Sequence, residues 1–123
     1  MSVWIDVDEA VARTRRGDIL IIVDDADREN EGDMFVAADH ATPDALNAFI
    51  THARGLVCVP MSGERLDSLE LPAMVRTNTS LHGTAFTVPV DARFGTTTGI
   101  SAFDRARTVK APVSYTHLTL PTI

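Results

Sequence analysis

Five aliphatic residues, Ile19-Leu20-Ile21-Ile22-Val23, are followed at once by the acidic segment Asp24-Asp25-Ala26-Asp27-Arg28-Glu29-Asn30-Glu31-Gly32-Asp33. A continuous aliphatic run of this length predicts a buried strand. The acidic segment then forms the loop that leaves the strand, and strand ends in layered α/β sheets are where ligands tend to bind. Like charges repel one another more strongly where water is excluded. So many carboxylates beside a core therefore indicate either a solvated loop or a bound cation.

Composition and charge are typical of a globular domain. The 123 residues are 45% hydrophobic and 23% charged, with a net charge of −6, which is neither disordered nor membrane-like. No stripe of Lys and Arg is present to neutralise phosphates, so we expect no nucleic-acid partner. No run approaches the ~18 apolar residues of a membrane span, and residues 1–6 lack a signal-peptide pattern. The single cysteine, Cys58, fits a reducing compartment, so we expect a cytoplasmic protein with no membrane partner.

Helix and strand patterns alternate on both sides of the acidic segment. Apolar spacing and capping residues predict helices over 3–15, 43–54, 62–69 and 102–110. Short apolar or alternating runs predict further strands over 34–38, 56–59 and 85–91. This order predicts an α+β fold in three layers, α/β/α, with helices packed on one mixed sheet.

Three interpretations of the acidic segment compete. A solvated surface loop is the simplest. A calcium loop of the EF-hand type fails, because counting from Asp27 places Gly32 at position six but Ala38, rather than Glu, at position twelve. A magnesium loop needs only one or two carboxylates, because water or substrate oxygens fill the other positions of the ion. Arg28 beside Glu29 would then suit a substrate that carries both phosphate and hydroxyl groups.

A series of motifs gives the chain a family resemblance. They are Asp25-Ala26-Asp27-Arg28-Glu29-Asn30-Glu31-Gly32-Asp33, Gly55-Leu56-Val57-Cys58, Leu71-Pro72-Ala73-Met74-Val75, His82-Gly83-Thr84-Ala85-Phe86-Thr87-Val88 and Thr97-Thr98-Gly99-Ile100-Ser101-Ala102-Phe103-Asp104-Arg105-Ala106. In this order they resemble the 3,4-dihydroxy-2-butanone 4-phosphate synthase family of riboflavin biosynthesis. The similarity runs from Ile5 to Lys110, so we expect a partial synthase domain over 1–110. Residues 111–123 depart from the family and are interpreted as an irregular tail foreign to the domain.

The resemblance implies a lyase that converts D-ribulose 5-phosphate to 3,4-dihydroxy-2-butanone 4-phosphate and formate. It also implies a cofactor, Mg²⁺ or Mn²⁺, and a homodimer. Carried over by position, Glu29 would bind the metal, and Arg28, Glu29 and Asp33 would contact the substrate. Asp33 and Glu31 would be the catalytic acid–base groups.

Two hydroxyls and one thiol complete the candidates. Thr98 and Ser101 precede the start of the helix predicted over 102–110, where a hydroxyl-rich turn can hold an anion, so both are candidate substrate contacts. Helix capping explains Ser101 equally well. Cys58 lies in an apolar run and is interpreted as core filling, with no nucleophilic role.

The resemblance also implies segments that this sequence does not contain. The family has an Arg-Pro-Gly-His segment, then an Arg-x-Gly-His-Thr segment with the second metal ligand and the phosphate contacts, and then a catalytic Glu. No Gly-His pair occurs in the chain, so we expect a truncated domain that is inactive alone. Two alternatives stay open: the N-terminal fragment of a bifunctional synthase and GTP cyclohydrolase II, and a non-catalytic acidic metal-binding module.

Overall fold

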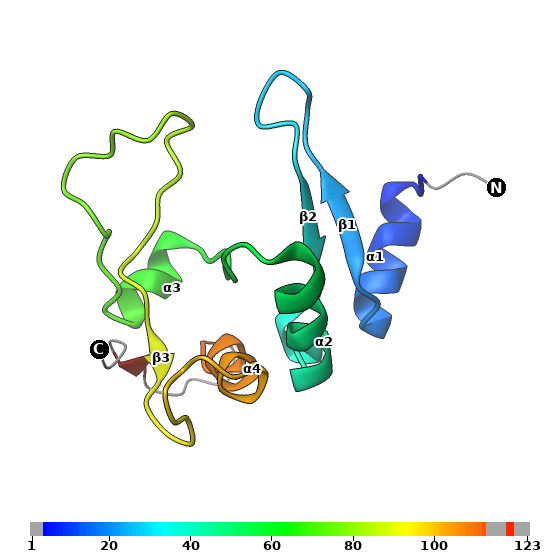
Figure 1. Cartoon of the computed structure of the whole chain (residues 1–123). Helices are drawn as coiled ribbons and strands as arrows, with labels where there is room; N and C mark the ends of the chain where they lie inside the picture. Colours follow the sequence, from blue (N-terminus) through cyan, green and yellow to red (C-terminus); the bar gives the residue numbers. More distant parts are fainter. Residues whose placement is uncertain (1–3, 113–117, 120–123) are drawn as a thin grey trace.

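The computed structural model describes residues 4–112 and 118–119, and Figure 1 shows their arrangement. A helix and a β-hairpin lie beside a group of short helices, from which a long loop projects. The α+β class is confirmed. No helix of the described chain has the length and apolarity that a membrane span requires. The elements are α1 (Val7–Arg16), β1 (Leu20–Val23), β2 (Gly32–Phe35), η1 (Ala38–His40), α2 (Pro43–Ala48), the π-helix η2 (Phe49–Ala53), α3 (Gly63–Ser68), β3 (Asp91–Ala92), α4 (Ala102–Lys110) and β4 (Leu118–Thr119).

The first helix begins and ends at residues whose chemistry favours those positions. Asp6 is the N-cap of α1, and its carboxylate accepts a hydrogen bond from the backbone N–H of Glu9 at 2.8 Å. Gly17 follows the last turn with φ 88°, a left-handed conformation that a glycine adopts without steric cost. A Cβ atom on this glycine would lie 2.8 Å from Cγ of His40. Gly17 therefore both ends α1 and lets η1 pack against the helix end.

The aliphatic run forms the first strand of an antiparallel hairpin. Ile22 of β1 lies opposite Asp33 of β2, and Val23 lies opposite Gly32. Because β2 begins at Gly32 rather than at the expected residue 34, Asp33 lies on the strand and not in the loop. The expectation that β1 is buried is wrong, since Ile21 is 69% exposed. The elements that pack on β1 include α1 and β2, and they leave most of its side chains accessible to solvent.

The strands of the described residues form two separate two-stranded antiparallel sheets, β1–β2 and β3–β4, instead of the one expected mixed sheet. The range 56–59 contains no strand, and the range 85–91 contributes one isolated bridge, between Ala73 and Thr87, and the first residue of β3. A strand needs a neighbour with which to exchange backbone hydrogen bonds. Neither range has such a neighbour along its length within the described chain. The apolar pattern of these ranges therefore does not by itself produce a strand.

The buried core lies between α2 and α4. Leu46 of α2 is 1% exposed and clusters with the buried Ala41 and Ala106. Half-buried apolar residues surround this cluster: Val36, Ala45, Val57, Ala102 and Val109. Leu46 is the large side chain that the described residues bury completely, so the packing of α2 on α4 centres on it.

Candidate active site

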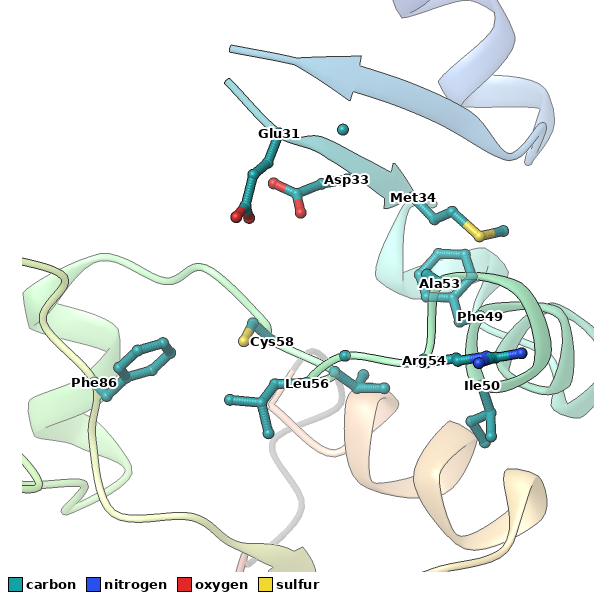
Figure 2. A pocket seen from close by; sticks show the side chains of 13 residues that line it. Glu31, Asp33, Met34, Phe49, Ile50, Ala53, Arg54, Leu56, Cys58 and Phe86 are labelled. Carbon is teal, nitrogen blue, oxygen red and sulfur yellow. The ribbon is translucent and has the colours of Figure 1, made fainter. Parts of the chain in front are cut away.

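A cleft of about 410 Å³ lies between the hairpin and the segment that follows α2. Figure 2 shows Glu31 and Asp33 on the hairpin side, with both carboxylates directed into the open space on the side of Cys58. Phe86 lies at the far end of the cleft. Much of the remaining lining is apolar and includes Met34, Phe49, Ile50, Leu56 and Val57. Two acidic groups therefore face a partly apolar cavity.

Glu31 and Asp33 reach this cleft because they lie two residues apart in extended chain. Alternate residues of an extended segment point to the same face, and Gly32, which begins β2, lies between them. The structure thus brings together the two residues that the family resemblance implies as the acid–base pair. Their catalytic role stays a prediction, and their shared position is observed.

Asp24 holds the acidic loop in its shape. Its Oδ1 accepts the backbone N–H of Glu31 at 2.8 Å, and its Oδ2 accepts that of Glu29 at 3.0 Å. These two N–H groups hold the pKa of Asp24 below its ordinary value against the opposing effect of partial burial, and the Arg28 guanidinium lowers it further. This organising role of Asp24 was not predicted from the sequence. The available signal was an aspartate directly after a strand, where its side chain bonds readily to nearby backbone N–H groups.

Acid is expected to loosen this loop. Because the pKa of Asp24 in the folded chain lies below the value of about 3.9 in the unfolded chain, its stabilising contribution is complete above that value. The contribution is lost as the pH falls through the folded pKa. We expect NMR order parameters of the Glu29 and Glu31 amides to fall as the pH is lowered below about 4.

Two variants test whether Asp24 causes this pH dependence of loop order. Asp24→Asn cannot change its charge, so its loop should show no such pH dependence. Asp25→Asn alters a neighbouring exposed acid and should retain the wild-type response. Loss of order over the same pH range in Asp24→Asn would assign the effect to another carboxyl group.

Arg28 and Glu29 are paired with each other instead of lining the cleft. Arg28 Nη1 lies 2.9 Å from Glu29 Oε1, and Arg28 Nε lies 2.8 Å from Asp24 Oδ2. Neither residue 28 nor residue 29 is among the lining residues. The structure therefore separates the expected metal ligand and one expected substrate contact from the carboxylates of Glu31 and Asp33.

The oxygen donors near the cleft have the chemistry that a hard divalent cation prefers. Mg²⁺ takes one or two protein carboxylates and keeps water or substrate oxygens as its other ligands, so Glu31 and Asp33 suit it as donors. Across the part of the chain that the structure describes, no three His, Cys, Asp or Glu side chains gather as a metal site. Glu29 would have to leave the Arg28 guanidinium before it could bind a cation.

Cys58 is an exposed residue that lines the cleft, so its interpretation as core filling is wrong. Residues 55–58 run along the cleft, whereas the core lies between α2 and α4. Partial burial raises the pKa of the Cys58 thiol, and the carboxylate of Asp33 raises it further. A thiolate is the nucleophilic form of cysteine, and the expectation that Cys58 has no nucleophilic role stays a prediction.

The backbone that leads into the cleft is strained. The helix expected over 43–54 changes from α to π at Phe49 and ends at Arg54, which has φ 68° and ψ −55°. The N–H of Gly55 donates to the carbonyl oxygen of Ala53 at 2.9 Å, which makes a γ-turn of the rare, strained type. π-Helical turns and strained residues concentrate at functional sites, and both occur here in residues that line the cleft.

Thr98 and Ser101 lie on the turn that joins β3 to α4, and neither lines the cleft. In Figure 1 this turn lies at the opposite end of the molecule from the loop between β1 and β2. Ser101 is the N-cap of α4 and accepts the N–H of Asp104 at 3.1 Å. The capping explanation of Ser101 is therefore confirmed, and a substrate role for either hydroxyl stays a prediction.

Comparisons with known proteins agree across most of the chain. Residues 8–119 match the sequence model of a family described as 3,4-dihydroxy-2-butanone 4-phosphate synthase. A protein of that name from Agrobacterium fabrum is 56% identical over 108 residues, which are 88% of this chain and 51% of the relative. The riboflavin biosynthesis protein RibBA of Phocaeicola vulgatus is 51% identical over 105 residues, which are 85% of this chain and 26% of the relative.

Solved structures give the same result. The crystal structure of a 3,4-dihydroxy-2-butanone 4-phosphate synthase in complex with two magnesium ions aligns with a TM-score of 0.92 and 36% identity. The alignment covers 96% of this chain and 57% of that chain. The chain thus spans about half the length, or less, of the curated relatives described here.

Proposed function

Because the chain belongs to the 3,4-dihydroxy-2-butanone 4-phosphate synthase family, we propose that it supplies the carboxylate half of a lyase site. The reaction converts D-ribulose 5-phosphate to 3,4-dihydroxy-2-butanone 4-phosphate and formate. The observation that carries this proposal is the pair of carboxylates, Glu31 and Asp33, that face one cleft beside the acidic loop.

Asp33 and Glu31 are the proposed acid–base groups. Enolisation of a ketose needs a base that removes a proton from a carbon next to the ketone and an acid that protonates the oxygen. Two carboxylates at one partly apolar cleft can divide these roles. Asp33 is also a proposed substrate contact, because it lies on β2, where the strand pairing holds its backbone in place.

Glu29 is the proposed metal ligand, and Arg28 and Glu29 are proposed substrate contacts. Bound Mg²⁺ or Mn²⁺ would supply positive charge to stabilise the negative oxygen that develops on the substrate. The relative that binds two magnesium ions supports the choice of a divalent cation. In this proposal the Arg28–Glu29 ion pair opens, so that Arg28 can contact the phosphate and Glu29 can bind the cation.

Thr98 and Ser101 are proposed as further substrate contacts, and they imply a second copy of the chain. Their turn and the acidic loop lie at opposite ends of one copy (Figure 1). One substrate molecule can meet both regions only where two copies pack together. A homodimer is therefore part of the proposal, with the substrate between the acidic loop of one copy and the turn of the other.

A longer, bifunctional context is the second candidate. The match to a RibBA protein supports the alternative that a GTP cyclohydrolase II domain belongs to the same protein.

The proposed domain covers 1–110, followed by a foreign tail over 111–123. Of this tail, 113–117 and 120–123 lie outside the described residues.

Cation and substrate binding by the chain itself test the proposal. Mn²⁺ broadens the NMR signals of nearby nuclei, and we expect it to broaden the amides of Glu29, Glu31 and Asp33 first. D-Ribulose 5-phosphate should shift the same signals only when Mg²⁺ is present. Asp8 and Glu9, in the first turn of α1, are matched control acids.

Two results would contradict the proposal. Equal broadening of the control acids would indicate non-specific attraction of the cation by negative charge. Tighter binding of Ca²⁺ than of Mg²⁺ would favour the acidic metal-binding module. Formate release by the chain alone would support the proposed reaction and would overturn only the expectation that the chain is inactive alone.

A further inference from the structure

Asp104 is a buried acidic residue that the proposed chemistry does not use. It is 5% exposed, and one of its oxygens, Oδ2, accepts three hydrogen bonds. The donors are Thr97 Oγ1 at 2.8 Å, the N–H of Gly99 at 3.0 Å and the N–H of Thr97 at 3.1 Å. The Thr97 hydroxyl is the largest cause that holds the pKa of Asp104 below its ordinary value. The group is therefore held as a carboxylate at neutral pH.

The three donors bracket Thr98. Thr97 and Gly99, on either side of it, are bound to Asp104, whereas Thr98 is exposed and makes no hydrogen bond within the described residues. Gly99 has φ 79°, and a Cβ atom on it would collide with the carboxylate of Asp91. Asp104 and Gly99 thus fix a turn whose central residue is left available for a ligand.

We propose that Asp104 is a positioning residue, which holds the 97–99 turn in the shape that presents Thr98 to a sugar phosphate. This inference rests on the proposed function, because that function assigns Thr98 to the substrate. A charged acceptor shared by several donors binds more strongly than a neutral one. If the turn is already ordered in the free chain, binding does not have to order it, and the entropy cost of binding is smaller.

Asp104→Asn is the sharpest variant, since it keeps the size of the side chain and removes its charge. We expect lower NMR order parameters at the amides of Thr97 and Gly99. The affinity for D-ribulose 5-phosphate, read at the Thr98 amide with Mg²⁺ present, should fall about tenfold. Glu9→Gln is the matched control, because Glu9 occupies the same third position of α1 after its N-cap, but its carboxylate pairs with Arg13 at the surface.

Substitutions at Thr97 separate positioning from general stability. Thr97→Val removes one donor to Asp104 and should weaken binding by about threefold. Thr97→Ser keeps that hydroxyl and should bind like the wild type. If Thr97 contributed only to stability, Thr97→Ser and Thr97→Val chains of equal melting temperature would bind the sugar phosphate with equal affinity.

The outcomes are decisive in both directions. Unchanged order at Thr97 and Gly99 in Asp104→Asn would overturn the inference, as would an equal loss of affinity in Glu9→Gln. If the sugar phosphate shifts Glu31 and Asp33 but leaves Thr98 unshifted in the wild-type chain, the inference fails and the carboxylate half of the proposed function stands. If it shifts none of them, the proposed function fails as well.

Discussion

Replacing Leu46 with alanine is expected to remove a large part of the free energy that stabilises the folded chain. Leu46 is 1% exposed, and its cluster otherwise contains only the small buried side chains of Ala41 and Ala106. A buried Leu→Ala change costs about 2–5 kcal/mol through lost burial and the cavity that remains. Whole domains are stable by only about 5–15 kcal/mol. The melting temperature, followed by circular dichroism, should therefore fall by about 10 °C or more.

Leu81→Ala is the control for this experiment. Leu81 is 91% exposed, and substitutions of this kind usually change stability by less than about 0.5 kcal/mol. If the Leu46→Ala chain had the same melting temperature as the Leu81→Ala chain, the contact between α2 and α4 would not be what holds the fold together.

Asp33→Asn is expected to abolish turnover while the fold is retained. The change keeps the shape of the side chain but removes its ability to accept a proton, and a positioned acid–base group typically contributes about 10²–10⁴-fold to a rate. Asp33 is exposed on β2. Its side chain makes no hydrogen bond or ion pair within residues 4–112, so the substitution removes no stabilising contact. Formate release should be measured in a complete synthase that carries residues 5–110 of this chain.

Two further variants make the result specific. Asp27→Asn changes an acid of the same loop that does not line the cleft, and it should leave turnover unchanged. Glu31→Gln should cause a smaller loss than Asp33→Asn, because Glu31 is the second acid–base group of the proposal. Turnover by Asp33→Asn within about twofold of the wild type would remove Asp33 from the mechanism.

Local sequence predicted most of the helix boundaries, although α1 begins at Val7 after its N-cap and not at the expected residue 3. Thr42 and Ser101 cap α2 and α4 through backbone N–H groups three residues later, and Gly17 ends α1. These interactions join residues within four positions of one another, so the chain carries all the information that they need. The family resemblance, which depends on ordered short motifs, was likewise readable from the chain and is confirmed.

Strand pairing and burial were predicted less well. The run that reads as a buried strand is exposed in β1, and Cys58 lines a cleft instead of filling the core. Apolar patterning reports what a segment can bury, whereas burial itself needs a second surface to pack against. Such a surface comes from residues far away in the chain.

The acidic segment and its neighbouring motifs established by themselves the family, the α+β class and the candidate carboxylates. Only the folded chain decided which of them share a cavity: Glu31 and Asp33 face one cleft, Arg28 and Glu29 are paired outside it, and Thr98 lies on a distant turn. The reason is physical. Chemical type is a property of each residue, but proximity depends on strand direction, turn geometry and packing between segments far apart in sequence.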